Sequence, residues 1–302
     1  MTLRRDQASP LSIPLSGLVP ARVVARPNRF VAEVVLGGAT GRIVTAHVAD
    51  SGRLKELIFP GNLVMVRKAV PATDGEQDKA QRKTNYDLVL ASAVEGGDDQ
   101  PVPVTPDDLG AQPGDATPQR RVWVSVDTRY PNMLFGQALR AGALKEFDCA
   151  CTVCQEHWYH HLSPWKEEDE GRAAGKAPSR PVRSRMDFYL DGGSRDRCCL
   201  IEVKSVTLCK DGVGLFPDAP TDRGARHLRE LARAVEAGYR AYAVFIAQRD
   251  DIRIIKPNRE TDPAFADALE HAAKAGVRLI GYRCRITPEG ISLDPAAIPV
   301  VT

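Results

Sequence analysis

The sequence predicts a two-domain protein of mixed α and β structure, with a small β-barrel followed by an α/β domain. The chain has 302 residues, which is long enough for two ordinary domains. Its first part contains short strand-like runs separated by Gly and Pro turns, a pattern that suits a barrel. Its second part alternates strand-like and helix-like segments, which is typical of helices packed on a mixed sheet.

The predicted barrel comprises residues 15–95. One short helical pattern, at residues 53–58, interrupts its strands, which we expect at residues 22–36, 41–47, 62–69 and 86–93. Residues 96–119 follow, with five Asp and no basic residue. Because this stretch is also rich in Pro and Gly, we expect an acidic linker or loop insertion there.

The predicted second domain comprises residues 120–302, with an insertion at about residues 150–182. In the helix expected after the hairpin, Leu228, Leu231 and Val235 form an apolar stripe, and Gly238 suits its C-terminal cap. The expected elements, in order, are a strand at residues 122–127, a helix at about 132–147, a hairpin at 184–205, a helix at 221–237, a strand at 239–247, a helix at 263–275 and a strand at 277–286.

Composition indicates a soluble globular protein, because 43% of residues are hydrophobic and 26% are charged. The formal net charge is only +2, so bulk basicity does not indicate a nucleic-acid partner. No apolar run approaches the roughly 18 residues that a membrane span needs, and Pro10 and Pro14 make the start a poor signal peptide. Seven cysteines in a chain of this size fit a reducing compartment. We therefore expect a cytoplasmic protein without membrane association.

The most informative segment is the predicted hairpin at residues 184–205. Two β-prone runs flank a turn-rich stretch, with Asp187 on the first run and Glu202-Val203-Lys204 on the second. Side chains alternate along a strand, so Glu202 and Lys204 point the same way, and pairing can bring Asp187 to that face. Two carboxylates and an ammonium there suit a hard divalent cation and a phosphate-directed reaction. The alternative is a surface Glu–Lys ion pair, which is worth at most about 1 kcal/mol.

Longer strings carry a resemblance to a known family. They are RPNRFVAEV (26–34), HVADSGRLKELIFPG (47–61), RKTNYDL (82–88), VDTRYPNMLFGQAL (126–139), and SRMDF and EVKS followed by SVTLCKDGVGLFPDAPTDRGARHLREL (205–231). In this order they closely resemble the sugar fermentation stimulation protein family. The resemblance implies an OB-like N-terminal barrel and a C-terminal PD-(D/E)xK nuclease-like domain, a mixed sheet flanked by helices. It also implies DNA binding and a link to sugar-utilisation genes.

For this family the hairpin implies a metal site. Asp187 and Glu202 would hold Mg²⁺ or Mn²⁺ with help from the Val203 carbonyl, and Lys204 would orient the attacking water or neutralise charge on phosphorus. The predicted catalytic residues are thus Asp187, Glu202 and Lys204. Two departures put two-metal hydrolysis in doubt: Gln137 stands where many relatives carry Glu, and residues 175–184 contain no acid. Glu146 or Asp148 is the candidate to compensate.

Basic residues in both domains are candidates for nucleic-acid contact. Those at the start of the helix after the hairpin could bind phosphate near the helix N-terminus, and those of the barrel mix with aromatic residues as in single-strand-binding barrels. The alternatives are a solvated helix face, a hydrogen-bonding role for the histidine, and barrel residues that organise the barrel itself. The candidates are Arg26, Arg29, Arg53, Lys55, Arg82, Lys83, Arg223, Arg226, His227 and Arg229.

One further segment is rich in cysteine and histidine. It contains Cys149, Cys151, Cys154, His157, His160 and His161, residue types that bind zinc. Their spacing does not match a standard zinc finger, and the segment adjoins the predicted insertion. We therefore expect free thiols and surface histidines rather than a Zn²⁺ site.

Three functions remain open from the sequence. The first is a DNA-binding protein with a nuclease-like divalent-metal site, with a possible role in regulating sugar utilisation. The second is an active Mg²⁺-dependent DNA phosphodiesterase. The third is a structural or small-ligand-binding protein whose barrel does not touch nucleic acid, which only the modest net charge favours.

Overall fold

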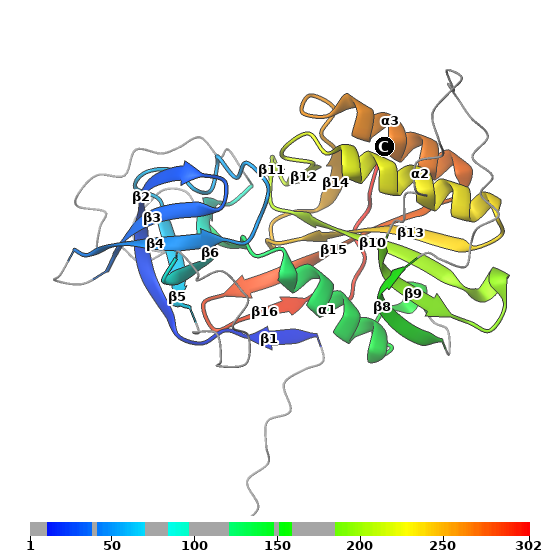
Figure 1. Cartoon of the computed structure of the whole chain (residues 1–302), viewed down its shortest axis with the longest axis horizontal. Helices are drawn as coiled ribbons and strands as arrows, with labels where there is room; N and C mark the ends of the chain where they lie inside the picture. Colours follow the sequence, from blue (N-terminus) through cyan, green and yellow to red (C-terminus); the bar gives the residue numbers. More distant parts are fainter. Residues whose placement is uncertain (1–10, 38–40, 70–83, 97–120, 148–150, 159–184) are drawn as a thin grey trace, which may run out of the picture.

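The computed structural model describes residues 11–37, 41–69, 84–96, 121–147, 151–158 and 185–302. Within these ranges, an N-terminal barrel and a C-terminal sheet covered by helices pack side by side (Figure 1). No helix in the described ranges has the length and apolar character needed to cross a lipid bilayer.

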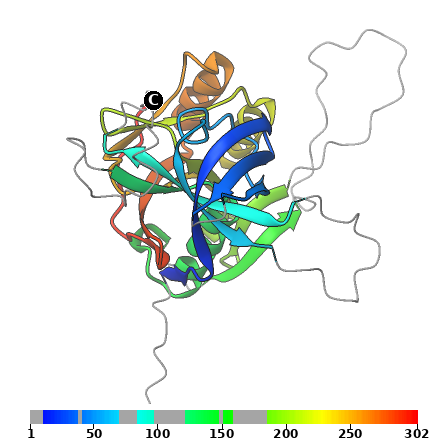
Figure 2. The same cartoon turned by 90° about the vertical axis from the view of Figure 1, so that its left-hand side faces the viewer.

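The N-terminal domain is a closed five-stranded barrel. Its strands are β2 (Leu18–Asn28), β3 (Val31–Leu36), β4 (Ile43–Val48), β5 (Leu63–Lys68) and β6 (Tyr86–Val94). They pair in the order β4-β3-β2-β5-β6, and a parallel pairing of β4 with β6 closes the sheet on itself. Alternate side chains point inward and fill the barrel with small and branched residues such as Ala32, Val34 and Val66. In Figure 2 the molecule is turned so that this domain faces the viewer.

Three local expectations for the barrel need correction. The strand expected at residues 22–36 is two strands, because the chain turns at Arg29 and Phe30 between β2 and β3. The short helix expected at residues 53–58 does not form, and the chain makes turns there instead. Strand β7 (Arg121–Ser125), expected to open the second domain, pairs with β6 and extends the barrel sheet.

The C-terminal domain is built on a seven-stranded mixed sheet in the order β1-β16-β15-β13-β10-β9-β8. The central strands β10, β13 and β15 are parallel, and the flanking pairs are antiparallel. Strand β1 comes before the barrel in the chain, yet it pairs with β16 and so belongs to the sheet of the C-terminal domain. The strands are β1 (Ser12–Pro14), β8 (Thr152–Trp158), β9 (Arg185–Asp191), β10 (Cys199–Val206), β13 (Arg240–Ala247), β15 (Arg278–Thr287) and β16 (Gly290–Leu293).

Helices cover both faces of this sheet, as Figure 1 shows. Helix α1 (Arg129–Arg140) packs on one face, through Leu134 and Phe135. Helices α2 (Asp222–Glu236) and α3 (Pro263–Ala275) pack on the other. The OB-like barrel and the mixed sheet with helices confirm the predicted fold class.

The start of α2 is fixed by local capping and by a neighbouring small sheet. The Thr221 hydroxyl accepts a hydrogen bond from the Gly224 N–H at 3.0 Å, which satisfies a free donor of the first turn. Just before it, β12 (Val213–Phe216) pairs with β11 (Cys209–Lys210) and β14 (Ile254–Pro257). Residues 217–220 therefore form a short connection held at both ends.

The two domains share a polar junction. Arg249 is fully buried, and its guanidinium donates to the Asp251 carboxylate at 2.7 and 2.9 Å and to the Val94 carbonyl at 2.9 Å. Asp251 also accepts from the Gly96 N–H at 2.7 Å. Since Val94 ends barrel strand β6 and Gly96 lies just beyond it, this ion pair ties the barrel to the C-terminal domain. The candidate site lies at the same junction.

Candidate active site at the domain junction

The hairpin of β9 and β10 places the two predicted carboxylates next to each other. Phe188 pairs with Ile201, so Asp187 and Glu202 are the next residues on the two antiparallel strands. The Asp187 Oδ2 atom accepts the backbone N–H of Val203 at 2.7 Å. Asp187 is therefore held against β10 rather than projecting freely into solvent.

Glu202 is the centre of a buried charged group. It is only 4% exposed, and its Oε1 atom contacts both the Lys204 Nζ, at 2.5 Å, and the Nδ1 of His227 on α2. Burial acts to raise the pKa of Glu202, but the charge of Lys204 and the contact with His227 outweigh it and lower the pKa to about 2. Glu202 is therefore ionised at neutral pH, as a cation ligand must be.

The pKa of Asp187 is shifted in the opposite direction to that of Glu202. Burial, followed by the negative charge of Glu202, raises the pKa of Asp187 to about 6, although Lys204 and the Val203 N–H act against the rise. Near neutral pH, an ionised Asp187 beside an ionised Glu202 therefore lowers the stability of the folded protein. A bound divalent cation would remove that destabilisation.

Two oxygen atoms around this pair have no hydrogen-bond partner among the described residues. One is Oε2 of Glu202, and the other is Oδ1 of Asn132 on α1. Asn132 uses its Nδ2 to donate to Asp187 at 3.3 Å. The described residues contain no group of three or more His, Cys, Asp and Glu side chains that could hold a metal. The available donors are therefore two carboxylates with neutral oxygens beside them, which suits a hard cation.

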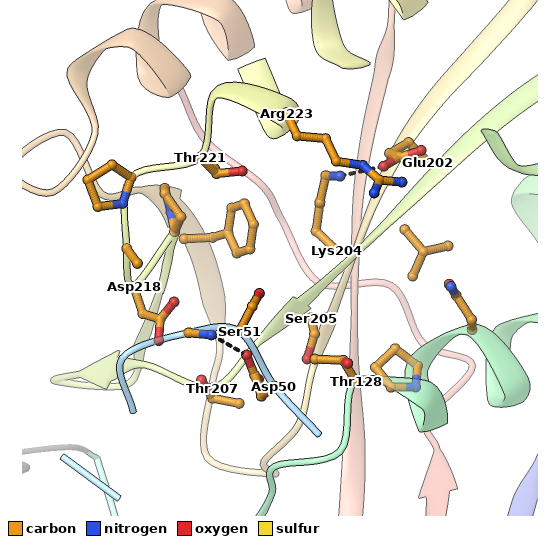
Figure 3. A pocket seen from close by; sticks show the side chains of 18 of the residues that line it. Asp50, Ser51, Thr128, Glu202, Lys204, Ser205, Thr207, Asp218, Thr221 and Arg223 are labelled. Carbon is orange, nitrogen blue, oxygen red and sulfur yellow. Dashed lines mark hydrogen bonds and ion pairs between the residues drawn. The ribbon is translucent and has the colours of Figure 1, made fainter. Parts of the chain in front are cut away.

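These residues line a cleft of about 420 Å³ between the two domains. Asp187, Glu202, Val203 and Lys204 form one wall. Figure 3 shows Lys204 and Glu202 on β10, with the side chain of Arg223 extending toward them from α2. The volume is in the range of small-ligand sites.

The opposite wall comes from the barrel and the connection before α2. The Asp50 carboxylate accepts the Gly52 N–H at 2.6 Å, and Asp218 accepts the Leu54 N–H at 3.2 Å. A Cβ at Gly52 would lie 2.3 Å from the Asp218 carboxylate, so a larger residue at this position would displace the Asp218 side chain. Burial raises the pKa of Asp50 to about 6, the nearby charge of Asp218 adds to the rise, and the hydrogen bond from Gly52 opposes it.

The predicted nucleic-acid-binding residues separate into groups. Arg29 and Arg223 line the cleft. Arg82 and Lys83 lie outside the described residues. Four more are exposed but are not among the described residues lining the cleft: Arg53, Lys55, Arg226 and Arg229.

The structure gives two of these residues contacts within the protein itself. His227 is 2% exposed and lies beneath Glu202, so it is too buried to contact a nucleic acid. The Arg26 guanidinium donates to the carbonyls of Arg53, Arg29 and Gly52, which means that it shapes the barrel loop. Burial lowers the pKa of Arg26, against the acidic side chains nearby.

Of the two candidate compensating acids, the structure describes only Glu146. Glu146 accepts the Tyr282 hydroxyl at 2.7 Å and is not among the described residues lining the cleft; neither is Gln137. Asp148 lies outside the described residues, as do Cys149, His160 and His161 of the Cys/His segment. Cys151 comes just before β8 and Cys154 lies on it; both are half-buried, and His157 lies on the same strand.

Sequence reasoning missed three residues that shape the site: Asn132, Asp50 and Asp218. All three occur within strings that carry the family resemblance, and that was the available signal. Nothing in their local sequence patterns indicated that they would line the same cleft as the hairpin.

The fold and the site define a two-domain protein in which an OB barrel and a helix-covered mixed sheet enclose an acidic cleft. The chain matches the family described as "Sugar fermentation stimulation protein RE domain" over residues 129–290, and "SfsA N-terminal OB domain" over residues 24–97. It therefore belongs to the sugar fermentation stimulation protein family, whose name refers to sugar utilisation.

Individual relatives agree with this assignment. A sugar fermentation stimulation protein homolog of Moorella thermoacetica is 37% identical over 278 residues, covering 92% of this chain and 94% of the relative. A homolog of Desulforamulus reducens is 37% identical over 288 residues, covering 95% of each chain. The solved structure of Pyrococcus furiosus SfsA in complex with Ca²⁺ shares the fold, with a TM-score of 0.67, 23% identity and coverage of 96% of this chain and 98% of that one.

Proposed function

We propose that this chain binds DNA in the interdomain cleft and is a divalent-cation-dependent phosphodiesterase. The observation that carries the proposal is the meeting of Asp187, Glu202 and Lys204 in one cleft with Arg29 and Arg223. Paired carboxylates with a raised pKa on one partner form an anionic pocket for a cation. The three cationic side chains give that pocket an attraction for phosphate.

The donor set favours Mg²⁺ or Mn²⁺. Asp187, Glu202 and the carbonyl of Val203 would supply hard oxygen ligands, and Glu202 keeps one carboxylate oxygen without a partner among the described residues. The Pyrococcus furiosus relative is described in complex with Ca²⁺, another hard cation. Zn²⁺ suits the cleft less well, because the imidazole of His227 faces Glu202 through Nδ1.

Lys204 carries the chemistry that the chain itself supplies. When bound, the cation would polarise the phosphate and stabilise charge that develops during hydrolysis. The Lys204 ammonium lies in the same wall, 2.5 Å from Glu202, where it can orient a water molecule or neutralise a non-bridging oxygen. Arg223 and Arg29 would hold the flanking phosphates.

A second candidate is a DNA-binding protein that does not turn over, linked to the regulation of sugar utilisation. The observation that favours it is the small number of acids on the hairpin side of the cleft. Gln137 has no carboxylate, and Glu146 is not among the described residues that line the cleft. In that case affinity should depend strongly on salt, with a slope of roughly −0.7 to −0.9 per phosphate contacted. A flat salt response would instead favour a protein that does not bind nucleic acid.

The test combines calorimetry with a cleavage assay. We expect Mg²⁺ or Mn²⁺ to bind the unmodified protein, and the double variant Asp187→Ala, Glu202→Ala to lose that binding, since both charged ligands are gone. Single- and double-stranded DNA should be cleaved with either cation and left intact in EDTA. Unchanged metal affinity in the double variant would overturn the assignment of the site. Intact DNA with a functional metal site would leave the binding protein as the correct function.

A further inference from the structure

Helix α1 carries two amide side chains whose buried oxygen atoms have no partner among the described residues. They are Oδ1 of Asn132 and Oε1 of Gln137. A buried carbonyl oxygen without a hydrogen bond is unfavourable, at about 1–3 kcal/mol, so each such atom needs an explanation. The two differ in position, because Asn132 lines the interdomain cleft and Gln137 is not among its described lining residues.

The orientation of Asn132 follows from its neighbour. Its Nδ2 donates to Oδ1 of Asp187 at 3.3 Å. An ionised carboxylate only accepts hydrogen bonds, so the amide must turn its NH₂ group toward Asp187. The amide oxygen then remains unpaired in the wall of the cleft, next to the carboxylate pair.

The same wall holds a second unpaired oxygen on a different element. Oε1 of Glu202 is occupied by Lys204 and His227, whereas Oε2 is buried without a partner among the described residues. Glu202 is 4% exposed, so water has little access to this atom. Helix α1 and strand β10 thus each present an unsatisfied oxygen beside Asp187.

We propose that Asn132 supplies a neutral oxygen ligand, through Oδ1, to the divalent cation of this cleft. The proposal rests on the proposed function and extends it to a residue of the first helix. A neutral ligand completes coordination without adding negative charge, which matters because the charge of Glu202 already raises the pKa of Asp187. On this basis the metal ligand that α1 contributes is Asn132 and not Gln137.

Two substitutions separate a ligand from a residue that merely positions Asp187. Asn132→Ala removes both the oxygen and the N–H donor, so either role predicts weaker binding. Asn132→Asp keeps an oxygen and adds charge but removes the donor to Asp187. If Oδ1 is a ligand, Asn132→Asp should bind the cation several-fold more tightly than the unmodified protein. If Asn132 acts only by donating from Nδ2 to Asp187, the new carboxylate of Asn132→Asp should repel Asp187 and weaken cation binding.

Calorimetric titration with Mn²⁺ and with Ca²⁺ tests this directly, with no need for activity. We expect Asn132→Ala to lose roughly 10- to 100-fold in affinity, as for other changes around metal ligands. Gln137→Ala is the matched control on the same helix and should bind as the unmodified protein does. A thermal unfolding scan of each variant in EDTA checks that it is folded.

Three outcomes would overturn the proposal. Equal affinity in Asn132→Ala shows that Oδ1 is not a ligand. Weakened binding in Asn132→Asp assigns Asn132 to positioning alone. An equal loss in Gln137→Ala indicates a general effect of disturbing α1. Absence of Mn²⁺ and Ca²⁺ binding in the unmodified protein is a separate result, because it overturns the proposed function as well.

Discussion

The two walls of the cleft each contain an aspartate whose pKa is raised to about 6, yet their surroundings differ. On the C-terminal wall Asp187 lies beside Glu202, with Lys204 and Asn132 as neighbours. On the barrel wall Asp50 lies near Asp218. In both pairs burial is the main cause, and the neighbouring carboxylate adds to it.

The difference lies in what the polar atoms are used for. On the barrel wall, Asp50 and Asp218 accept backbone N–H groups of the loop, and Arg26 donates to its carbonyls. On the C-terminal wall, Glu202 and Asn132 each keep a buried oxygen without a partner among the described residues. Unsatisfied oxygens are costly for stability and useful for binding. If the proposed function is correct, the barrel wall holds the domains together through the contact of Asp218 with Leu54, and the C-terminal wall performs the chemistry.

The largest expected effect is that of Lys204→Ala. If the C-terminal wall is catalytic, cleavage should fall on the order of 10²-fold or more, because an electrostatic stabiliser of the transition state is removed. DNA affinity should change little, because Lys204 is one cation among several contacts. Initial rates and fluorescence anisotropy on the same oligonucleotide measure both effects.

The control for that comparison is Lys210→Ala, an exposed lysine on β11. It should leave both rate and affinity unchanged. If the unmodified protein does not cleave and Lys204→Ala weakens only binding, the C-terminal wall serves DNA contact and not hydrolysis.

The next effect concerns the pH dependence of stability in the absence of metal. Both Asp187 and Asp50 have a pKa of about 6 in the folded protein, above the ordinary value of 3.8. The folded state therefore binds more protons than the unfolded state between about pH 7 and pH 4. We expect the free energy of unfolding to rise as pH falls through 6, by on the order of 3 kcal/mol per group. Urea denaturation in EDTA at several pH values measures it.

Glu202 affects stability in the opposite direction and over a lower pH range, because its pKa is lowered. Its pKa is lowered from 4.5 to about 2, so it contributes stability above pH 4.5 that is lost as pH falls toward 2. Asp187→Asn and Asp50→Asn should each flatten part of the rise between pH 7 and 4. Added Mg²⁺ should suppress only the part due to Asp187. Suppression of both parts would show that the barrel wall also binds the cation.

Much of the fold follows from local sequence patterns. Helices α2 and α3 have an apolar stripe and clear caps, and their observed bounds lie within a residue or so of the predicted ones. Strand β1 was not predicted from the sequence, because it has only three residues. Strand β7 was predicted as a strand but assigned to the second domain, whereas it pairs with barrel strand β6. Strand pairing between distant segments depends on the whole topology.

In the candidate site, too, some residues could be predicted from local sequence patterns and others depend on long-range packing. Asp187 and Glu202 are close because one hairpin joins them, and a hairpin is a local structure. Asn132 and Asp218 reach the cleft only through the packing of α1 and the docking of the two domains. The sequence also could not show that His227 is buried, because its exposure is decided by how α2 packs on β10.

The smallest expected effect separates two arginines that are close in sequence. Arg26 is engaged with loop carbonyls, whereas Arg29 is exposed and lines the cleft. Arg26→Ala should lower the free energy of unfolding by about 1 kcal/mol, because partly exposed hydrogen bonds are lost, while DNA affinity per folded molecule stays nearly constant. Arg29→Ala should do the reverse: the salt dependence of DNA binding should decrease by about one phosphate contact, with little change in stability. Denaturation curves and binding isotherms on both variants decide it. If Arg26→Ala loses the phosphate contact and Arg29→Ala loses the stability, the assignment of the barrel wall to holding the domains together is wrong.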